Sequence, residues 1–214
     1  MRILDRFRTE RSELIPITGF IFVPYALYRR FRPHLSRPWF NDRAVLLLDR
    51  IINPNSRILE IGAGGSTLWY AKRGRSVLSV EGSRDWHSRV SESTSSYADV
   101  EVVFVEDENV VPFISGLKDN YDVVVIDALL PEGRVAVTSA VKEKFPDSIV
   151  VVDDQDWIGH REIDNIMADW ACIRVAGIKP TPFNSYETNF FSKVPLEQQG
   201  VKIPWLIRLT TSRL

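Results

Sequence analysis

The sequence has few of the residues that build disulfides and structural zinc sites. Its 214 residues include a single cysteine, Cys172, and three histidines. One cysteine cannot form an internal disulfide, and so few thiols and imidazoles cannot supply a zinc cluster. We therefore expect a cytoplasmic protein that is stabilised by a hydrophobic core, for which this length is ample.

The sequence also has no surplus of charge of either sign. Its 27 lysine and arginine residues nearly balance 28 aspartate and glutamate residues, which gives a formal net charge of −1 at pH 7. A protein that binds nucleic acid through the phosphates carries a basic surplus or a basic patch. The balance therefore disfavours a nucleic-acid partner, although it leaves local basic patches open.

The apolar run at residues 14–28 is too short to span a bilayer. A transmembrane helix needs about 20 residues, whereas this run has 15 and is interrupted by Pro16, Gly19 and Pro24. The arginine-rich sequence after it has no small-residue cleavage site of a signal peptide. We expect residues 1–45 to be an N-terminal extension that forms a lid or packing segment. Peripheral membrane contact through 14–28 and a homo-oligomer interface are the alternatives.

A glycine-rich loop follows the first strand-like run of the chain. The sequence RILEIGAGG at residues 57–65 leads from an apolar run into Gly62, Gly64 and Gly65. Glycines at such a turn let a ligand approach the backbone closely. Ser66 and Thr67 are then expected to cap a helix that runs through residue 72. The pattern indicates a site for a nucleotide cofactor.

Acidic residues around this loop distinguish two cofactor classes. Glu81, nineteen residues after the first glycine, ends the next apolar run, where a carboxylate can accept both ribose hydroxyls of NAD(P) or of S-adenosylmethionine. Glu60 suits the cationic amino group of a methionine moiety, directly or through water, and suits a pyrophosphate poorly. The dinucleotide pattern needs a third glycine where this chain has Thr67. Glu106 and Asp107 offer acceptors for the adenine amino group, so the details together favour S-adenosylmethionine.

Together, these residues resemble the class I S-adenosylmethionine-dependent methyltransferase family. The resemblance implies S-adenosylmethionine as cofactor and a methyl acceptor as second substrate. It also implies that the cofactor is bound by residues of the loop and of the neighbouring strand ends: Glu60, Gly62, Ala63, Gly64, Ser66, Glu81, Gly82, Glu106, Asp107 and Asp127. For the loop alone, a glycine-rich turn without any cofactor is the alternative.

Beyond the loop, strand-like and helix-like runs alternate with short connections. This pattern is typical of a parallel sheet that is covered on both faces. We predict an α/β fold: a single domain at residues 46–193 with a Rossmann-like, seven-stranded, mostly parallel sheet and helices on both faces. The predicted strands are 58–61, 76–80, 100–105, 122–126, 148–152, 171–178 and 186–191, and the later helices are 84–93, 134–144 and 158–169. Residues 194–214 are expected to be a tail without clear periodicity.

Three aspartates follow strand-like runs at the edge where ligands collect in such sheets. Asp127 ends DVVVID, and Asp153 and Asp154 end IVVVDD. Three carboxylates there suggest a hard cation such as Mg²⁺, which can bind substrate oxygens and lower the pKa of a hydroxyl. The trio and the segment 153–160, DDQDWIGH, resemble the acidic loops of metal-dependent catechol-type and macrocin-type O-methyltransferases. The resemblance implies that all three aspartates are metal ligands.

One departure from those enzymes concerns the general base. They place a lysine or aspartate two or three residues after the strand-four aspartate, where this chain has Leu129 and Leu130. The base then comes from elsewhere, with His160 or Asp156 nearest in sequence, or the metal-assisted mechanism does not apply. Our candidate catalytic residues are Asp127, Asp154 and His160. The alternative roles of Asp153 and Asp154 are to cap a helix and to bind the loop.

The function predicted from these patterns is S-adenosylmethionine-dependent O-methylation of a small molecule of sugar or phenol type, with metal assistance left open. Methyl transfer requires mainly that nucleophile, methyl carbon and sulfur lie in line, so positioning provides most of the rate. A methyltransferase-like protein that binds without catalysis is one alternative. An NAD-dependent oxidoreductase is the other, and it is disfavoured because the sequence has no Tyr-x-x-x-Lys pair.

Overall fold

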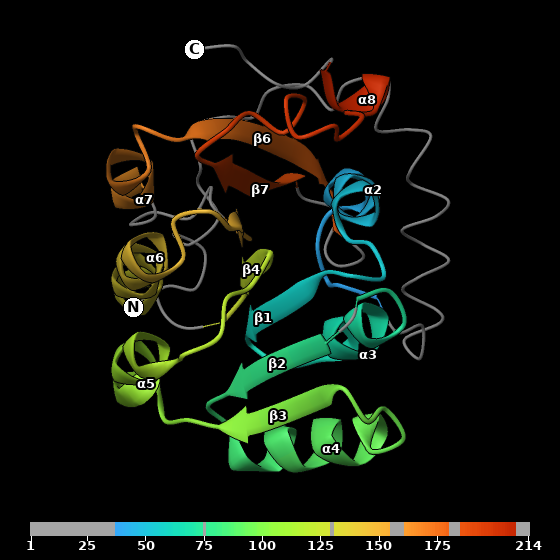
Figure 1. Cartoon of the computed structure of the whole chain (residues 1–214), viewed down its shortest axis with the longest axis vertical. Helices are drawn as coiled ribbons and strands as arrows, with labels where there is room; N and C mark the ends of the chain where they lie inside the picture. Colours follow the sequence, from blue (N-terminus) through green and yellow to red (C-terminus); the bar gives the residue numbers. More distant parts are fainter. Residues whose placement is uncertain (1–36, 75, 129–130, 155–160, 180–184, 209–214) are drawn as a thin grey trace, which may run out of the picture.

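Seven strands form one sheet with helices on both of its faces (Figure 1). The computed structural model describes residues 37–74, 76–128, 131–154, 161–179 and 185–208. The strands are β1 Arg57–Ile61, β2 Ser76–Glu81, β3 Val100–Phe104, β4 Val123–Ile126, β5 Ile149–Val152, β6 Ala171–Ile178 and β7 Ser185–Ser192. Their order in the sheet is β3-β2-β1-β4-β5-β7-β6.

The sheet is parallel except at one edge. Strands β1 to β5 pair in parallel, whereas β7 pairs antiparallel with both β5 and β6. Strand β6 therefore runs in the same direction as β5, with β7 between them. The predicted α/β fold with a Rossmann-like, mostly parallel, seven-stranded sheet is confirmed.

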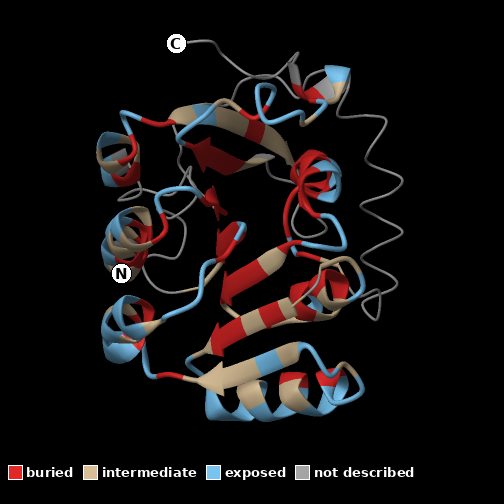
Figure 2. Ribbon diagram, in the orientation of Figure 1, coloured by how far each residue is buried: buried red, intermediate tan, exposed pale blue. Residues whose placement is uncertain are grey.

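Two apolar layers hold the helices against the sheet. The helices are α2 Asp42–Ile51, α3 Gly65–Ala71, α4 Arg84–Thr94, α5 Val110–Gly116, α6 Pro131–Lys144, α7 Arg161–Ile166 and α8 Trp205–Arg208, with a short 3₁₀ helix at Asp107–Asn109. Buried side chains of α2 and α3 share one core cluster with one face of the central strands, and those of α5, α6 and α7 share another cluster with the opposite face. Figure 2 shows the buried residues concentrated between helices and sheet.

The central strands follow directly from their sequences. Strand β4 reads VVVI and strand β5 reads IVVV, and every residue of both is buried. β-Branched side chains fit a pleated surface, and a parallel strand covered on both faces needs apolar residues at consecutive positions. This is why the two strands could be located from sequence within one residue.

The strand order places a ligand-binding edge next to β1. After β1 the chain moves outward to β2 and β3, and then returns to place β4 on the other side of β1. Ligands bind where the strand order reverses in this way, beyond the carboxyl ends of the strands. Asp127, which follows β4, donates its backbone N–H to the carbonyl of Ile61 at 2.9 Å. The loops after β1 and β4 therefore lie side by side at that edge.

Several helices differ from the prediction. The sequence analysis assigned no helix to α2 or α5, and it expected α7 to continue to residue 169 rather than end at Ile166. Helix α2 begins after Asn41, whose side-chain oxygen accepts from the N–H of Ala44 at 2.9 Å. The same side chain donates to the carbonyl of Val175 at 2.9 Å. Helix α2 is thus tied to strands that lie far downstream in the sequence.

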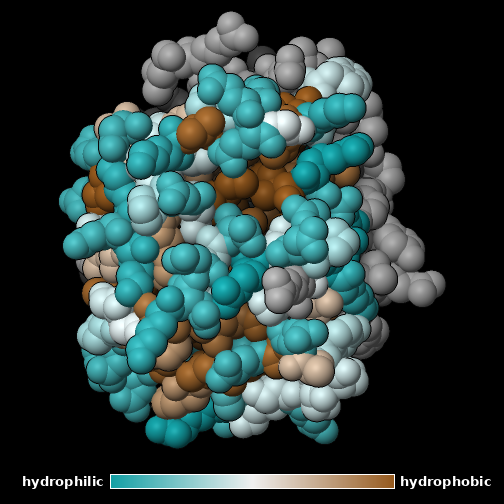
Figure 3. Space-filling model, viewed as in Figure 1, coloured by the Kyte–Doolittle hydropathy of each residue, from teal (hydrophilic) through white to brown (hydrophobic). Residues whose placement is uncertain are grey.

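The described part of the chain contains no candidate for a membrane-spanning helix. None of the described helices has the length and apolar character to cross a bilayer. The face seen in Figure 3 is largely hydrophilic, with hydrophobic side chains gathered in an upper and a lower area. The run at 14–28 lies outside the described residues, so membrane contact and an oligomer interface there stay predictions.

Candidate functional site

Glu81 connects the two loops of the predicted cofactor site. Its carboxylate accepts the backbone N–H of Ala63 at 3.1 Å, in the loop between β1 and α3. It also accepts the backbone N–H of Ser83 at 2.8 Å, in the turn between β2 and α4. Each carboxylate oxygen has a second lone pair. Glu81 is therefore fixed in orientation and can still accept hydroxyl groups of a ligand.

The glycine loop is shaped by its contact with the loop that follows β4. Gly62 has φ +105°, a conformation that side-chain-bearing residues rarely adopt, and its N–H donates to the carbonyl of Val80 at 2.8 Å. A Cβ at this position would lie 2.7 Å from the Cβ of Ala128. Trp86 covers the loop by donating its indole N–H to the carbonyl of Ala63 at 2.6 Å. Glycine at position 62 is thus required by backbone conformation and by space.

Glu60 is fully buried beneath the loop. Its carboxylate accepts hydrogen bonds from the hydroxyls of Ser66, Thr67 and Ser79, the one from Thr67 at 2.6 Å. Burial outweighs these hydrogen bonds and raises the pKa of Glu60 to about 7. The predicted contact between Glu60 and the methionine ammonium stays a prediction.

The start of α3 differs from the expected cap. Gly64 is the N-cap residue, and the hydroxyl of Thr67 accepts its N–H at 2.9 Å from the third helical position. Ser66 instead donates to Glu60. Sequence analysis identified two hydroxyl residues at this helix start, but not that both point at a buried carboxylate.

The ends of β2 and β3 meet beside the glycine loop. A Cβ on Gly82 would collide with the carboxylate of Asp107, so these two residues are in close contact. Arg84 lies 3.7 Å from a carboxylate oxygen of Glu106, measured between Nη2 and Oε1. The predicted adenine acceptors therefore lie near Glu81, as the parallel arrangement of β2 and β3 requires.

Three aspartates converge at the ends of β4 and β5. Each of Asp127, Asp153 and Asp154 offers a carboxylate oxygen within 4.8 Å of the others. Asp154 has φ 53°, in the left-handed region that aspartate tolerates better than most residues. Sequence analysis predicted that these carboxylates come together, and the structure agrees.

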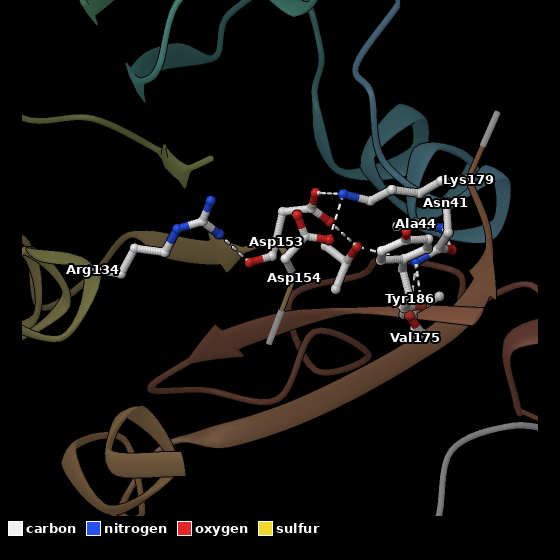
Figure 4. Close-up of polar contacts among 9 residues, drawn as sticks. Asn41, Ala44, Arg134, Asp153, Asp154, Val175, Lys179 and Tyr186 are labelled. Atoms are coloured by element: carbon white, nitrogen blue, oxygen red, sulfur yellow. Dashed lines mark hydrogen bonds and ion pairs between the residues drawn. The ribbon is translucent and has the colours of Figure 1, made fainter. Parts of the chain in front are cut away.

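Sequence analysis missed the cation in this cluster, Lys179. Its Nζ lies 2.5 Å from Oδ2 of Asp153 and 2.5 Å from Oδ1 of Asp154 (Figure 4). Lys179 follows β6, which runs in the same direction as β5, so it lies at the carboxyl edge that also holds the aspartates. Lys179 directly follows a predicted strand, as the three aspartates do, but the edge of the sheet at which it lies depends on the direction of β6.

Further contacts surround the backbone and side chain of Asp153. Thr188 of β7 donates its hydroxyl to Oδ1 of Asp153 at 2.5 Å. Arg134 of α6 donates to the backbone carbonyl of the same residue at 2.5 Å, from the side opposite Lys179 in Figure 4. Asp153 is fully buried, and Arg134 is nearly so. Asp153 is therefore surrounded by cationic and hydroxyl donors.

Charges in the cluster shift each other's pKa values. Burial and the charge of Asp153 raise the pKa of Asp127 well above its ordinary value. Burial also raises the pKa of Asp153, although Lys179 opposes this. Burial alone would lower the pKa of Lys179, but the carboxylates of Asp153, Asp154 and Asp127 outweigh it and raise that pKa. The surrounding carboxylates thus favour the protonated form of Lys179.

The residues present do not fit the predicted Mg²⁺ as they stand. A divalent ion needs carboxylate oxygens that are available for coordination, whereas the ammonium of Lys179 contacts two of the three carboxylates. His160, Asp156, Leu129 and Leu130 lie outside the described residues. The catalytic role of His160 stays a prediction.

Comparisons with known proteins support the fold and leave the acceptor open. No protein-family model and no curated protein sequence matches the chain. Among solved structures, the chain is similar to the N-methyltransferase NodS from Bradyrhizobium japonicum, with 15% identity, TM-score 0.57 and coverage of 72% of this chain and 96% of that chain. It is also similar to the O-methyltransferase from Bacillus cereus in complex with SAH, with 15% identity, TM-score 0.55 and coverage of 83% and 94%.

A third similar structure is an rRNA methylase from Streptococcus thermophilus, with 10% identity, TM-score 0.53 and coverage of 68% of this chain and 92% of that chain. The three proteins are named for different acceptors, so the shared feature is the architecture of the sheet and its helices. The chain therefore has the fold of class I S-adenosylmethionine-dependent methyltransferases.

Proposed function

We propose that the protein is an S-adenosylmethionine-dependent methyltransferase that methylates an oxygen of a small molecule of sugar or phenol type. The observation that carries the proposal is the position of Glu81. Its carboxylate is held by N–H groups of Ala63 and Ser83 beside the glycine loop, at the edge where the strand order reverses. A carboxylate held in that orientation suits the two hydroxyls of a ribose.

The surroundings of Thr67 support this cofactor over NAD. A dinucleotide loop needs glycine at position 67 so that helix and strand can pack closely. Thr67 is instead fully buried, and its hydroxyl bridges Glu60 and the N–H of Gly64. A buried carboxylate beneath the loop suits a cationic methionine moiety and disfavours a pyrophosphate.

Asp127 is our candidate for the group that accepts the proton. In the proposed step, the acceptor hydroxyl oxygen bonds to the methyl carbon, the carbon–sulfur bond breaks with its electrons moving to sulfur, and Asp127 takes the hydroxyl proton. Burial and Asp153 raise the pKa of Asp127. A carboxylate with a raised pKa is a stronger base than an ordinary one. The products are the methyl ether and S-adenosylhomocysteine.

Replacing Asp127 by asparagine is expected to lower methyl transfer about 100-fold, because an amide cannot accept the proton. The assay incubates the protein with S-adenosylmethionine carrying a CD₃ group and a panel of sugars and phenols, and detects labelled ether by mass spectrometry. Asp147→Asn is the matched control, since Asp147 is exposed at the opposite end of β5.

The same assay distinguishes the proposal from a binding protein. Labelled product that depends on Asp127 supports a methyltransferase. Cofactor binding with no labelled product from any acceptor of the panel would favour the non-catalytic alternative. Equal rates for Asp127→Asn and wild type would remove Asp127 from the reaction.

A further inference from the structure

We propose that Lys179 is the resident cation of the acidic cluster and takes the place of a divalent metal ion, so that the site works without a metal. The inference rests on the proposed function for the identity of the site. Its evidence is the geometry of Lys179 with Asp153 and Asp154, which is independent of which acceptor is methylated.

The ammonium of Lys179 fills the position where a metal would coordinate. Its Nζ is 2.5 Å from one oxygen of Asp153 and 2.5 Å from one oxygen of Asp154. Mg²⁺ binds oxygen at about 2.1 Å, so an ion on either oxygen would lie within about 4.6 Å of Nζ. Two cations so close in a buried site repel each other strongly. Lys179 in this position therefore opposes the binding of a divalent ion at these two oxygens.

The fold builds this arrangement from elements that are distant in sequence. Lys179 is only 5% exposed and Asp153 is fully buried, so the pair lies inside the protein rather than on a solvated surface. Thr188 of β7 holds the other oxygen of Asp153, and Asn41 donates to Thr188 at 3.1 Å and to the carbonyl of Val175 at 2.9 Å. In Figure 4, Lys179 points toward Asp153 and Asp154 from the side on which Asn41 and Tyr186 lie.

The ring of Tyr186 adds to the surroundings of the ammonium. Nζ of Lys179 lies 5.0 Å from the centre of that ring, within the range of a cation–π contact. An aromatic face attracts a cation but offers no oxygen ligand to a metal. The ammonium of Lys179 thus lies between carboxylates and an aromatic ring, surroundings that suit an organic cation better than a metal ion.

The test uses Mn²⁺ alone as the probe, measured by electron paramagnetic resonance and by titration calorimetry without cofactor or acceptor. Wild type is expected to bind no Mn²⁺ at this cluster. Lys179→Ala is expected to bind one ion, at least about tenfold more tightly than the weakest binding that the titration of wild type could detect, because the three carboxylates lose their counter-ion. Lys179→Ala with Asp153→Asn is expected to lose that binding. Lys179→Arg keeps the charge and is expected to behave as wild type.

Two outcomes would overturn the proposal: Mn²⁺ binding to wild type that Asp153→Asn abolishes, or a folded Lys179→Ala that binds no more tightly than wild type. If Lys179→Ala does not fold alone, recovery of its thermal transition by Mg²⁺ supports the proposal. Without such recovery, the Mn²⁺ titration of wild type decides: no binding supports the proposal, and binding that Asp153→Asn abolishes overturns it. Because neither cofactor nor acceptor is present, failure here is distinguishable from failure of the proposed methyl transfer.

Discussion

Glu81→Ala is expected to weaken the binding of S-adenosylhomocysteine about 100-fold, because two hydrogen bonds from ribose hydroxyls to a charged group are lost. The variant also removes the acceptor for the N–H groups of Ala63 and Ser83, so both turns of the site lose a common support. Titration calorimetry of wild type and variant measures the dissociation constants directly.

The matched control is Glu101→Ala. Glu101 lies on β3 and is exposed, and its removal changes the net charge by the same amount as the removal of Glu81. The control is expected to bind S-adenosylhomocysteine as wild type does. Equal affinity in Glu81→Ala and Glu101→Ala would show that Glu81 does not contact the cofactor.

Glu60→Gln is expected to remove the pH dependence that Glu60 gives to the free energy of unfolding of the protein. The pKa of Glu60 is raised by burial from 4.5 to about 7, so the folded protein binds the proton more tightly than the unfolded chain. The contribution of Glu60 to stability is therefore fully present below about pH 4.5 and is lost as the pH rises through about 7. A shift of this size corresponds to about 3 kcal/mol.

Urea unfolding of wild type and Glu60→Gln, at pH 4.5 and at pH 8 without cofactor, measures this effect. The free energy of unfolding of Glu60→Gln, relative to wild type, is expected to increase by about 3 kcal/mol between these pH values. The near-isosteric amide serves as the control for lost contacts, since those contribute at both pH values. A difference between the two proteins that does not change with pH would mean that Glu60 has an ordinary pKa.

The sheet and the convergence of the aspartates could be predicted because both depend on local patterns. Strands such as VVVI and IVVV are continuous apolar runs, and their parallel pairing brings the residues that follow them to one edge. Asp127, Asp153 and Asp154 therefore meet wherever β4 and β5 are neighbours. The only tertiary feature needed was the pairing of β4 with β5, which the predicted fold already implied.

Lys179 and Asn41 could not be placed so easily, because their partners depend on the order of strands. Lys179 reaches Asp153 only because β7 inserts between β5 and β6, which sets β6 in the direction of β5. Asn41 caps helix α2, which the sequence analysis did not assign, and its bond to Val175 joins residues 134 positions apart. Neither the strand insertion nor that distant contact has a local sequence signal.

Glu60 illustrates a third case, in which the residue was identified and its surroundings were not. Its position before the glycine loop marked it as a cofactor residue, whereas its three hydroxyl partners depend on register. Strand pairing sets Ser79 opposite Glu60, and helix α3 brings Ser66 and Thr67 over it. Glu60 therefore has hydrogen-bond partners within the protein itself.

The account is tested most directly by titration calorimetry of the wild-type protein with S-adenosylhomocysteine, and with NAD⁺ as the comparison ligand. The geometry of Glu81, Glu60 and the glycine loop predicts saturable one-to-one binding of S-adenosylhomocysteine and no binding of NAD⁺. Binding of NAD⁺ alone, or of neither ligand, would contradict the central claim that this edge of the sheet is a site for S-adenosylmethionine.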